Sequence, residues 1–169
     1  MQENLFYCDD NLLLLEKEHD YKEAISYLFK KFEEEPTDKI LSTIIGDSWY
    51  YLTEECRDDC DSILWNFLLE AWKKSISLGE KNYKYSQIVN FIIGYTLYFD
   101  WIMLLDKEPA CNQILMRAIS LEPTSLLAEF ITLFIKKSAT HKYSQKFCSL
   151  FAKQSLLDNY FRSIYCNDK

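Results

Sequence analysis

Hydrophobic side chains recur at intervals of three and four residues along nearly the whole chain. In the segment 41–52 the apolar positions are Leu41, Ile44, Ile45, Trp49 and Leu52, which is the spacing of one face of an α-helix. The segments 24–32 and 111–118 have the same spacing. The pattern predicts an all-α fold in which each helix buries one face.

Residues that begin and end helices lie between these segments. Asp20 and Glu23 have the spacing of a capping box, and Gly79 suits the end of a helix. Proline at 36, 109 and 123 suits a helix boundary or a first helical turn. The sequence therefore predicts one domain, residues 1–169, of about eight helices in four antiparallel hairpins: 3–18 with 20–35, 37–54 with 60–79, 83–106 with 109–121, and 124–138 with 142–166.

The composition excludes several classes of fold. Only 3 Gly and 3 Pro occur, too few for the frequent turns of a β-sandwich or barrel. No two glycines lie close enough to form a glycine-rich phosphate loop. Hydrophobic residues make up 49% of the chain and aromatic residues 16%, so the chain can bury a sizeable core and disorder is excluded.

The net charge narrows the choice of partner and location. A formal charge of −7 argues against nucleic acid and anionic membranes and favours a basic protein partner. The segment 88–105 is apolar and long enough to span a bilayer, but a carboxylate near the middle of a span is costly, and Asp100 together with the absence of flanking Lys/Arg asymmetry favours a buried helix instead. The N-terminus lacks the features of a secretory signal, so we expect a cytoplasmic protein.

The cysteines and histidines predict neither a metal site nor catalysis. Cys56 and Cys60 lack C-x-x-C spacing, and the only histidines are His19 and His141, which gives too few soft ligands for zinc. The 6 Cys are expected to be free thiols rather than disulfides, because a chain of this size does not need covalent links. No signature of a catalytic nucleophile occurs, so we expect no cofactor, no metal, no catalytic residue and no enzymatic activity.

Two pairs of segments resemble each other and suggest a repeat. Residues 44–49 resemble 92–97, with a glycine followed three residues later by a large side chain, and 74–80 resembles 117–123. With Tyr21, Ala24, Leu28 and Pro36, these pieces resemble the tetratricopeptide repeat family. The resemblance implies helical hairpins stacked as a short, irregular right-handed array. The chain departs from the family pattern at Leu12, at insertions in the second and third hairpins, and in the fourth hairpin, which has no recognisable motif.

The resemblance also implies a concave groove lined by the first helix of each hairpin. The helical positions that face the groove in the family can be counted from the helix glycine. Counted from Gly46, they are occupied by Asp47, Tyr50 and Tyr51. Counted from Gly94, they are occupied by Tyr95 and Tyr98. Some tetratricopeptide domains hold the carboxylate tail of a chaperone with basic groove residues. This chain has acidic and aromatic residues at the matching positions, so the resemblance argues against that ligand. Phe91 and Phe99 are expected to fill the core.

An acidic insertion follows the predicted helix 37–54 and completes the expected binding surface. Five carboxylates lie between positions 54 and 61 with a single arginine, so the segment is either a solvated loop or a contact patch for a basic partner. The predicted partner-binding residues are Asp47, Tyr50, Tyr51, Glu54, Glu55, Asp58, Asp59, Asp61, Tyr95 and Tyr98.

These features favour a non-catalytic protein-binding module. The leading hypothesis is a bacterial immunity protein that neutralises a basic, nuclease-type toxin domain through an acidic and aromatic surface. A second hypothesis is a tetratricopeptide-type secretion chaperone that holds an extended segment in its groove. A helical enzyme is the third.

Overall fold

The computed structural model describes residues 4–56, 61–99, 110–136, 145–151 and 155–166. These residues form eight α-helices and no strand, which confirms the predicted all-α fold. The α-helices are α1 (Asp10–Lys17), α2 (Tyr21–Glu34), α3 (Asp38–Tyr50), α4 (Ser62–Asn82), α5 (Gln87–Tyr98), α6 (Ala110–Leu121), α7 (Leu126–Lys136) and α8 (Leu156–Tyr165). A π-helical turn, η1 (Tyr51–Glu55), continues α3, and a 3-10 helix, η2 (Gln145–Leu150), precedes α8. Within these residues, no helix combines the length and apolar character needed to cross a membrane.

Short polar side chains fix where the helices begin. Asp20 accepts a hydrogen bond from the backbone N–H of Glu23, as the sequence predicts. The other side-chain N-caps are Asp9, Thr37, Asp61, Ser86 and Ser155. Each satisfies an N–H that the first turn leaves unpaired, so the helix starts are encoded locally.

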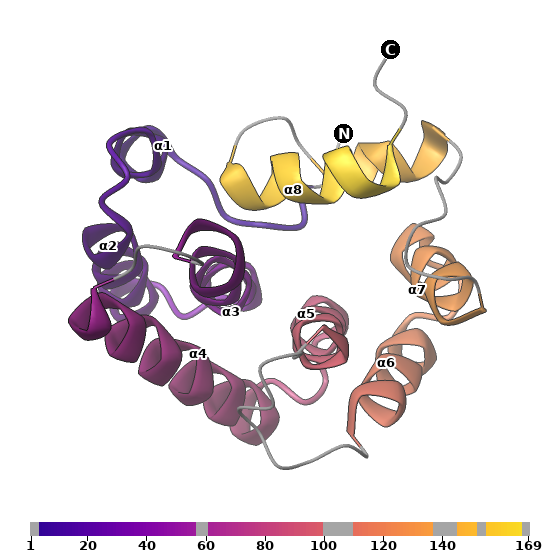
Figure 1. Ribbon diagram of the computed structural model, residues 1–169. Coiled ribbons are helices and arrows are strands. Elements are labelled where there is room, and N and C mark those ends of the chain that lie inside the picture. The colour runs from indigo at the N-terminus through magenta and orange to yellow at the C-terminus, as the bar shows by residue number, and fades with distance from the viewer. Residues whose placement is uncertain (1–3, 57–60, 100–109, 137–144, 152–154, 167–169) are drawn as a thin grey trace.

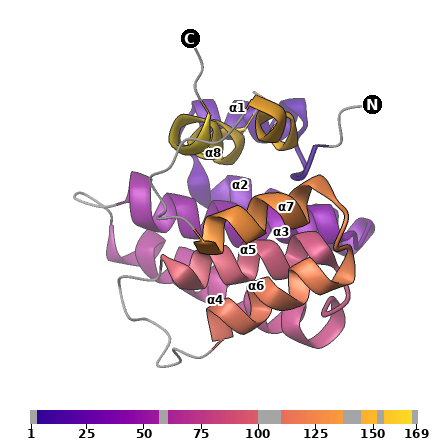
Figure 2. The same cartoon turned by 90° about the vertical axis from the view of Figure 1, so that its right-hand side faces the viewer.

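The helices form an inner and an outer layer. Helices α3 and α5 lie at the centre, α2, α4 and α6 form an arc outside them, and α7 continues the periphery beside α6 (Figure 1). Helices α1 and α8 lie over the open side of the inner layer, and Figure 2 shows them as a layer above the other helices. The inner helices are therefore covered on both sides, which explains why every residue from Ile40 to Trp49 is buried.

Helix α8 packs its apolar face on the inner layer. Leu157, Phe161 and Tyr165 recur every four residues and are at most 1% exposed. The Phe161 ring lies 4.7 Å from that of Tyr95 on α5 and 5.9 Å from that of Phe91. Leu157 lies against Gly46 on α3, where an added Cβ would overlap its side chain. Helix α8 thus fills the side of the inner layer on which the sequence predicts a groove.

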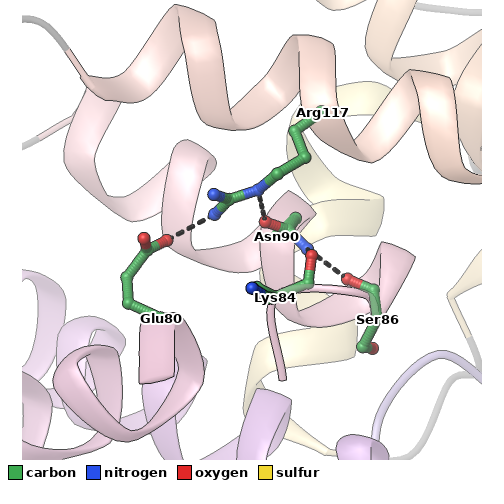
Figure 3. A network of polar contacts seen from close by, with 5 residues as sticks. All are labelled: Glu80, Lys84, Ser86, Asn90 and Arg117. Carbon is green, nitrogen blue, oxygen red and sulfur yellow. Dashed lines mark hydrogen bonds and ion pairs between the residues drawn. The ribbon is translucent and has the colours of Figure 1, made fainter. Parts of the chain in front are cut away.

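A polar network joins α4, α5 and α6 (Figure 3). The Arg117 guanidinium donates to Asn90 Oδ1 at 2.5 Å and to Glu80 at 2.6 Å. The amide of Asn90 donates to the carbonyls of Lys84 and Ser86. Asn90 is only 1% exposed, so this network satisfies a buried polar side chain.

Two predicted boundaries are wrong. The first helix begins at Asp10 rather than at residue 3, because residues 4–9 pass along α3, where the Tyr7 N–H donates to Thr43 Oγ1 at 2.8 Å. The predicted helix 142–166 is divided into η2 and α8. Ser155 causes the second start, because its side chain caps α8. Predicted helical residues at 3, 60, 100–106, 109, 137–138, 142–144 and 152–154 lie outside the described residues.

The expectation of free thiols is wrong for Cys148 and Cys166. These two residues form a disulfide with a Cα–Cα distance of 5.8 Å, which joins η2 to the end of α8. Cys8 and Cys111 are free. The sequence prediction failed because the pairing depends on how α8 folds back on η2, and because it assumed a reducing compartment. A disulfide persists best in an oxidising compartment, which weakens the basis for expecting a cytoplasmic protein.

Candidate functional site

Three of the predicted groove residues lie in the interior. Asp47, Tyr51 and Tyr95 are all 0% exposed. The Tyr51 hydroxyl donates to Glu16 Oε1 at 3.0 Å, and the Tyr95 hydroxyl lies 3.0 Å from that of Tyr165. The expectation that these residues line an open groove is therefore corrected, because α1 and α8 cover this face of the inner helices.

An open cleft remains where η1 meets α8, and it contains two of the predicted residues. Its volume is about 520 Å³. Tyr50 and Glu54 line one side, and five residues of α8 line the other. We call it the acidic–aromatic cleft, and its lining residues are Tyr50, Glu54, Leu156, Asn159, Tyr160, Ser163 and Ile164.

The π-helical turn η1 positions the carboxylates beside this cleft. The N–H of Cys56 bonds to the carbonyl of Tyr51 at 2.8 Å, which closes the wider turn of a π-helix. At the end of this turn, Glu55 accepts hydrogen bonds from Tyr21 at 2.7 Å and from Tyr50 at 3.0 Å. Glu55 therefore orients the Tyr50 ring, while Glu54 stays exposed at the cleft.

Tyr160 forms the aromatic wall of the cleft on α8. Its ring contacts Tyr50 at 5.3 Å and Trp49 at 5.6 Å, both with edge-to-face geometry. Burial raises the pKa of Tyr160 to about 12, the hydrogen bond with Tyr95 opposes this shift, and the Glu54 carboxylate adds the smallest contribution, which also raises the pKa.

The cleft has the chemistry to recognise a cation. It presents the Glu54 carboxylate beside the rings of Tyr50 and Tyr160, and none of the described residues that line it is a lysine or arginine. A carboxylate attracts an ammonium or guanidinium group, and aromatic faces add a cation–π contribution. Asn159 and Ser163 add exposed polar groups at the α8 side. A lysine or arginine side chain of a partner fits this combination.

The other predicted binding residues are spread over the surface. Asp61 is exposed and caps α4 through its bond to the Ile63 N–H. Tyr98 is 48% exposed, but its ring packs on Phe99 and Phe134, away from the residues that line the cleft. Asp58 and Asp59 lie outside the described residues. The structure thus brings Tyr50, Glu54 and Glu55 together and leaves Tyr98 elsewhere.

Two other clefts lack this combination of groups. A cleft of about 210 Å³ lies at the starts of α3, α5 and α7, but two of its polar side chains already accept hydrogen bonds, Asp38 from Ser86 and Gln87 from Ser125. A cleft of about 600 Å³ between α2 and α4 is mainly apolar, and Lys74 lies over the Phe29 ring there. Among the described side chains, no group of His, Cys, Asp and Glu could hold a metal ion.

Sequence reasoning missed the α8 side of the cleft. The spacing of Leu157, Phe161 and Tyr165 was available as a signal of an amphipathic helix, and it leaves Asn159 and Tyr160 beside the buried face. The sequence does not reveal which helices α8 covers, because that depends on contacts distant along the chain. The burial of Glu16 also depends on contacts distant along the chain. In the sequence it is an ordinary charged helical residue, but in the structure it is only 4% exposed.

Neither the sequence nor the fold identifies a relative of this chain. No protein-family model, curated protein or solved structure matches it.

Proposed function

We propose that the protein is a non-catalytic binding module that holds a basic protein partner at the acidic–aromatic cleft. The observation that supports this most strongly is the position of Glu54 beside the rings of Tyr50 and Tyr160 in an open cleft whose described lining residues include no basic side chain. Aromatic anchors supply contact area, and carboxylates speed the encounter with a basic surface.

Within this class, an immunity protein is the finer proposal. The net charge of −7 and the exposed carboxylates at 54, 55 and 61 suit a protein that competes with nucleic acid for a basic nuclease-type toxin domain. The secretion-chaperone alternative requires an open inner groove for an extended segment. The burial of Asp47, Tyr51 and Tyr95 argues against it. No observation favours a helical enzyme over these two.

Photo-crosslinking from the cleft tests the proposal. A photoreactive phenylalanine analogue is placed at Asn159 in the cleft, and at Ser77 on α4 as a control, since both positions are exposed. We expect irradiation in a lysate of the native host to join a basic protein to position 159 but not to position 77. Equal labelling from both positions, or an acidic partner, would contradict the proposal.

The immunity hypothesis is tested separately, by whether the protein inhibits the captured partner. If the captured protein is a nuclease, the purified chain should inhibit its cleavage of DNA or RNA at near-stoichiometric ratio. A captured protein without nuclease activity would leave the binding module intact and remove the toxin assignment.

A further inference from the structure

Three carboxylates from distant parts of the chain meet beneath the start of α8. Glu16 on α1 is 4% exposed, and Asp47 on α3 and Asp158 on α8 are both 0% exposed. Buried carboxylates are rare unless they are paired with cations or fully hydrogen-bonded. Neither Glu16 nor Asp47 has a salt bridge in the part of the chain that the structure describes.

Glu16 ties the start of α8 to the rest of the molecule. Its Oε2 accepts the backbone N–H of Leu156, the first residue of α8, at 3.1 Å, and its Oε1 accepts the Tyr51 hydroxyl at 3.0 Å. Asp158 lies in the same turn, where its N–H bonds to the Ser155 side chain that caps the helix. The first turn of α8 is therefore held where the acidic groups meet.

Asp47 is the least satisfied member of the group. Neither of its carboxylate oxygens has a hydrogen bond of good geometry to a described residue. Burial, and then the charges of Glu16 and Asp158, raise the pKa of Asp47 well above its usual range, with a smaller opposing effect of the Tyr51 hydroxyl. Burial also raises the pKa of Glu16, against the lowering effect of the bonds from Leu156 and Tyr51.

In the described part of the chain, the other titratable groups that face Glu16 and Asp47 do not offset their charge. The N-terminal segment contributes Cys8 and, behind it, Asp9; η1 contributes Tyr51, next to Tyr21 of α2. Burial, followed by the charges of Glu16, Asp158, Asp47 and Asp9, raises the pKa of Cys8 to about 12. All of these groups are neutral or acidic, so ionisation of Glu16 and Asp47 places like charges together beneath α8.

We propose that α8 is a proton-dependent latch, docked on α1 and α3 while Glu16 and Asp47 share protons and released at its first turn when both are ionised. The disulfide between Cys148 and Cys166 keeps the other end of α8 attached to η2. Release is therefore local and reversible. Because α8 supplies five of the residues that line the acidic–aromatic cleft, release also opens that cleft, a consequence that rests on the proposed function.

Hydrogen exchange of the purified full-length protein tests the latch without any partner. Amide protection of α8, corrected for intrinsic exchange, is measured from about pH 5 to about pH 8, above the ordinary range of carboxyl pKa values. We expect α8 protection to fall with rising pH by up to about tenfold per pH unit for each carboxyl that ionises on release. Protection of α5 should fall less, since α5 contributes none of these carboxylates.

Neutral variants identify the groups responsible. Asp47→Asn and Glu16→Gln keep the side-chain size and remove the charge, so each should flatten the pH dependence of α8 protection. Glu70→Gln, an exposed change on α4, should leave it unchanged. The latch is overturned if wild-type α8 protection is constant over this range, or if it falls as steeply in both neutral variants. Because no partner is present, this result is independent of whether the cleft binds a basic protein.

Discussion

Gly46 lies where α8 crosses α3, and it shows how a single side chain controls this crossing. A Cβ at this position would overlap with Leu157 Cδ2 and lie 3.3 Å from Leu157 Cδ1 and 3.4 Å from Ile92 Cδ1. Leu157 is itself 0% exposed, so it cannot turn away freely. The absence of a side chain at Gly46 therefore permits α8 to approach the inner layer closely.

Replacement of Gly46 by alanine should weaken the docking of α8. We expect Gly46→Ala to lower the free energy of unfolding by about 1–2 kcal/mol, because overpacking exceeds the gain in helix propensity. Leu157→Ala alone should cost about 2–5 kcal/mol. In the double variant the new methyl group occupies part of the vacated space, so urea denaturation should show less than the sum of the two losses. Simple additivity would mean that the two residues do not contact each other in solution.

Cys8 offers a residue-level test of the buried acidic group. Burial, followed by the charges of Glu16, Asp158, Asp47 and Asp9, raises the pKa of Cys8 to about 12. Because the thiolate is the reactive form, alkylation of Cys8 near pH 8 should be about 10³-fold slower in the folded protein than in urea, as followed by peptide mass spectrometry. The Asp47→Asn variant should react faster than the parent. Equal rates in folded and unfolded protein would show that Cys8 does not lie near these charges.

At the scale of elements, local sequence signals determine the helices but not their final contacts. The periodicity at 41–52 and the caps at Asp20 and Thr37 depend on neighbours within a few residues, so they could be predicted. The burial of Asp47 and Tyr95 depends on α8, which is distant along the chain, and no local pattern reports it. The division of 142–166 into η2 and α8 was missed because the helical periodicity conceals the cap at Ser155.

The Arg117 network tests how strongly α4, α5 and α6 are joined (Figure 3). Asn90→Ala should lower the free energy of unfolding by about 1–3 kcal/mol, because it leaves Arg117 and two backbone carbonyls without their buried partner. Glu80→Ala should cost about 0–1 kcal/mol, because its ion pair with Arg117 is between side chains 40% and 36% exposed. Chemical denaturation measures both. A larger loss from Glu80→Ala would show that the surface ion pair, rather than Asn90, holds these helices together.

At the scale of the whole molecule, opposing pKa shifts define the pH at which the fold is most stable. The pKa values of Glu16 and Asp47 are raised on folding. The stabilisation of the folded state that these two groups provide is therefore present below the ordinary carboxyl pKa, and it is lost as the pH rises through their pKa values in the folded protein. For Asp9, burial raises the pKa, but hydrogen bonds from Tyr27, Tyr7 and the Leu12 N–H lower it overall. The stabilisation of the folded state by Asp9 is therefore present above the ordinary carboxyl pKa and is lost as the pH falls through the lowered pKa.

This balance predicts a stability maximum in mildly acidic solution. Between about pH 5 and pH 8 the free energy of unfolding should fall with a slope of up to about 1.4 kcal/mol per pH unit for each proton that the folded state retains. Urea titrations across this range measure the slope, and Asp47→Asn should reduce it. A stability that rises steadily to pH 8 would contradict the buried protonated carboxylates.

The cleft itself combines what the sequence predicts with what only the fold supplies. Tyr50 was an expected binding residue because of its helical phase relative to Gly46, and Glu54 because it begins an acidic segment. Tyr160 and Asn159 join them only because α8 folds back across α3. The binding surface that we propose is therefore assembled from two segments that are distant along the chain, and its electrostatic part should affect association more than dissociation.

The most direct test is the association rate of the captured partner across a salt series. Glu54→Gln should slow association several-fold at low salt and flatten its salt dependence, because it removes the carboxylate of the acidic–aromatic cleft. Glu70→Gln removes the same charge from α4 and should match the parent, while Tyr160→Ala should mainly speed dissociation. If Glu54→Gln and Glu70→Gln have the same rates at every salt concentration, this cleft is not where the basic partner binds.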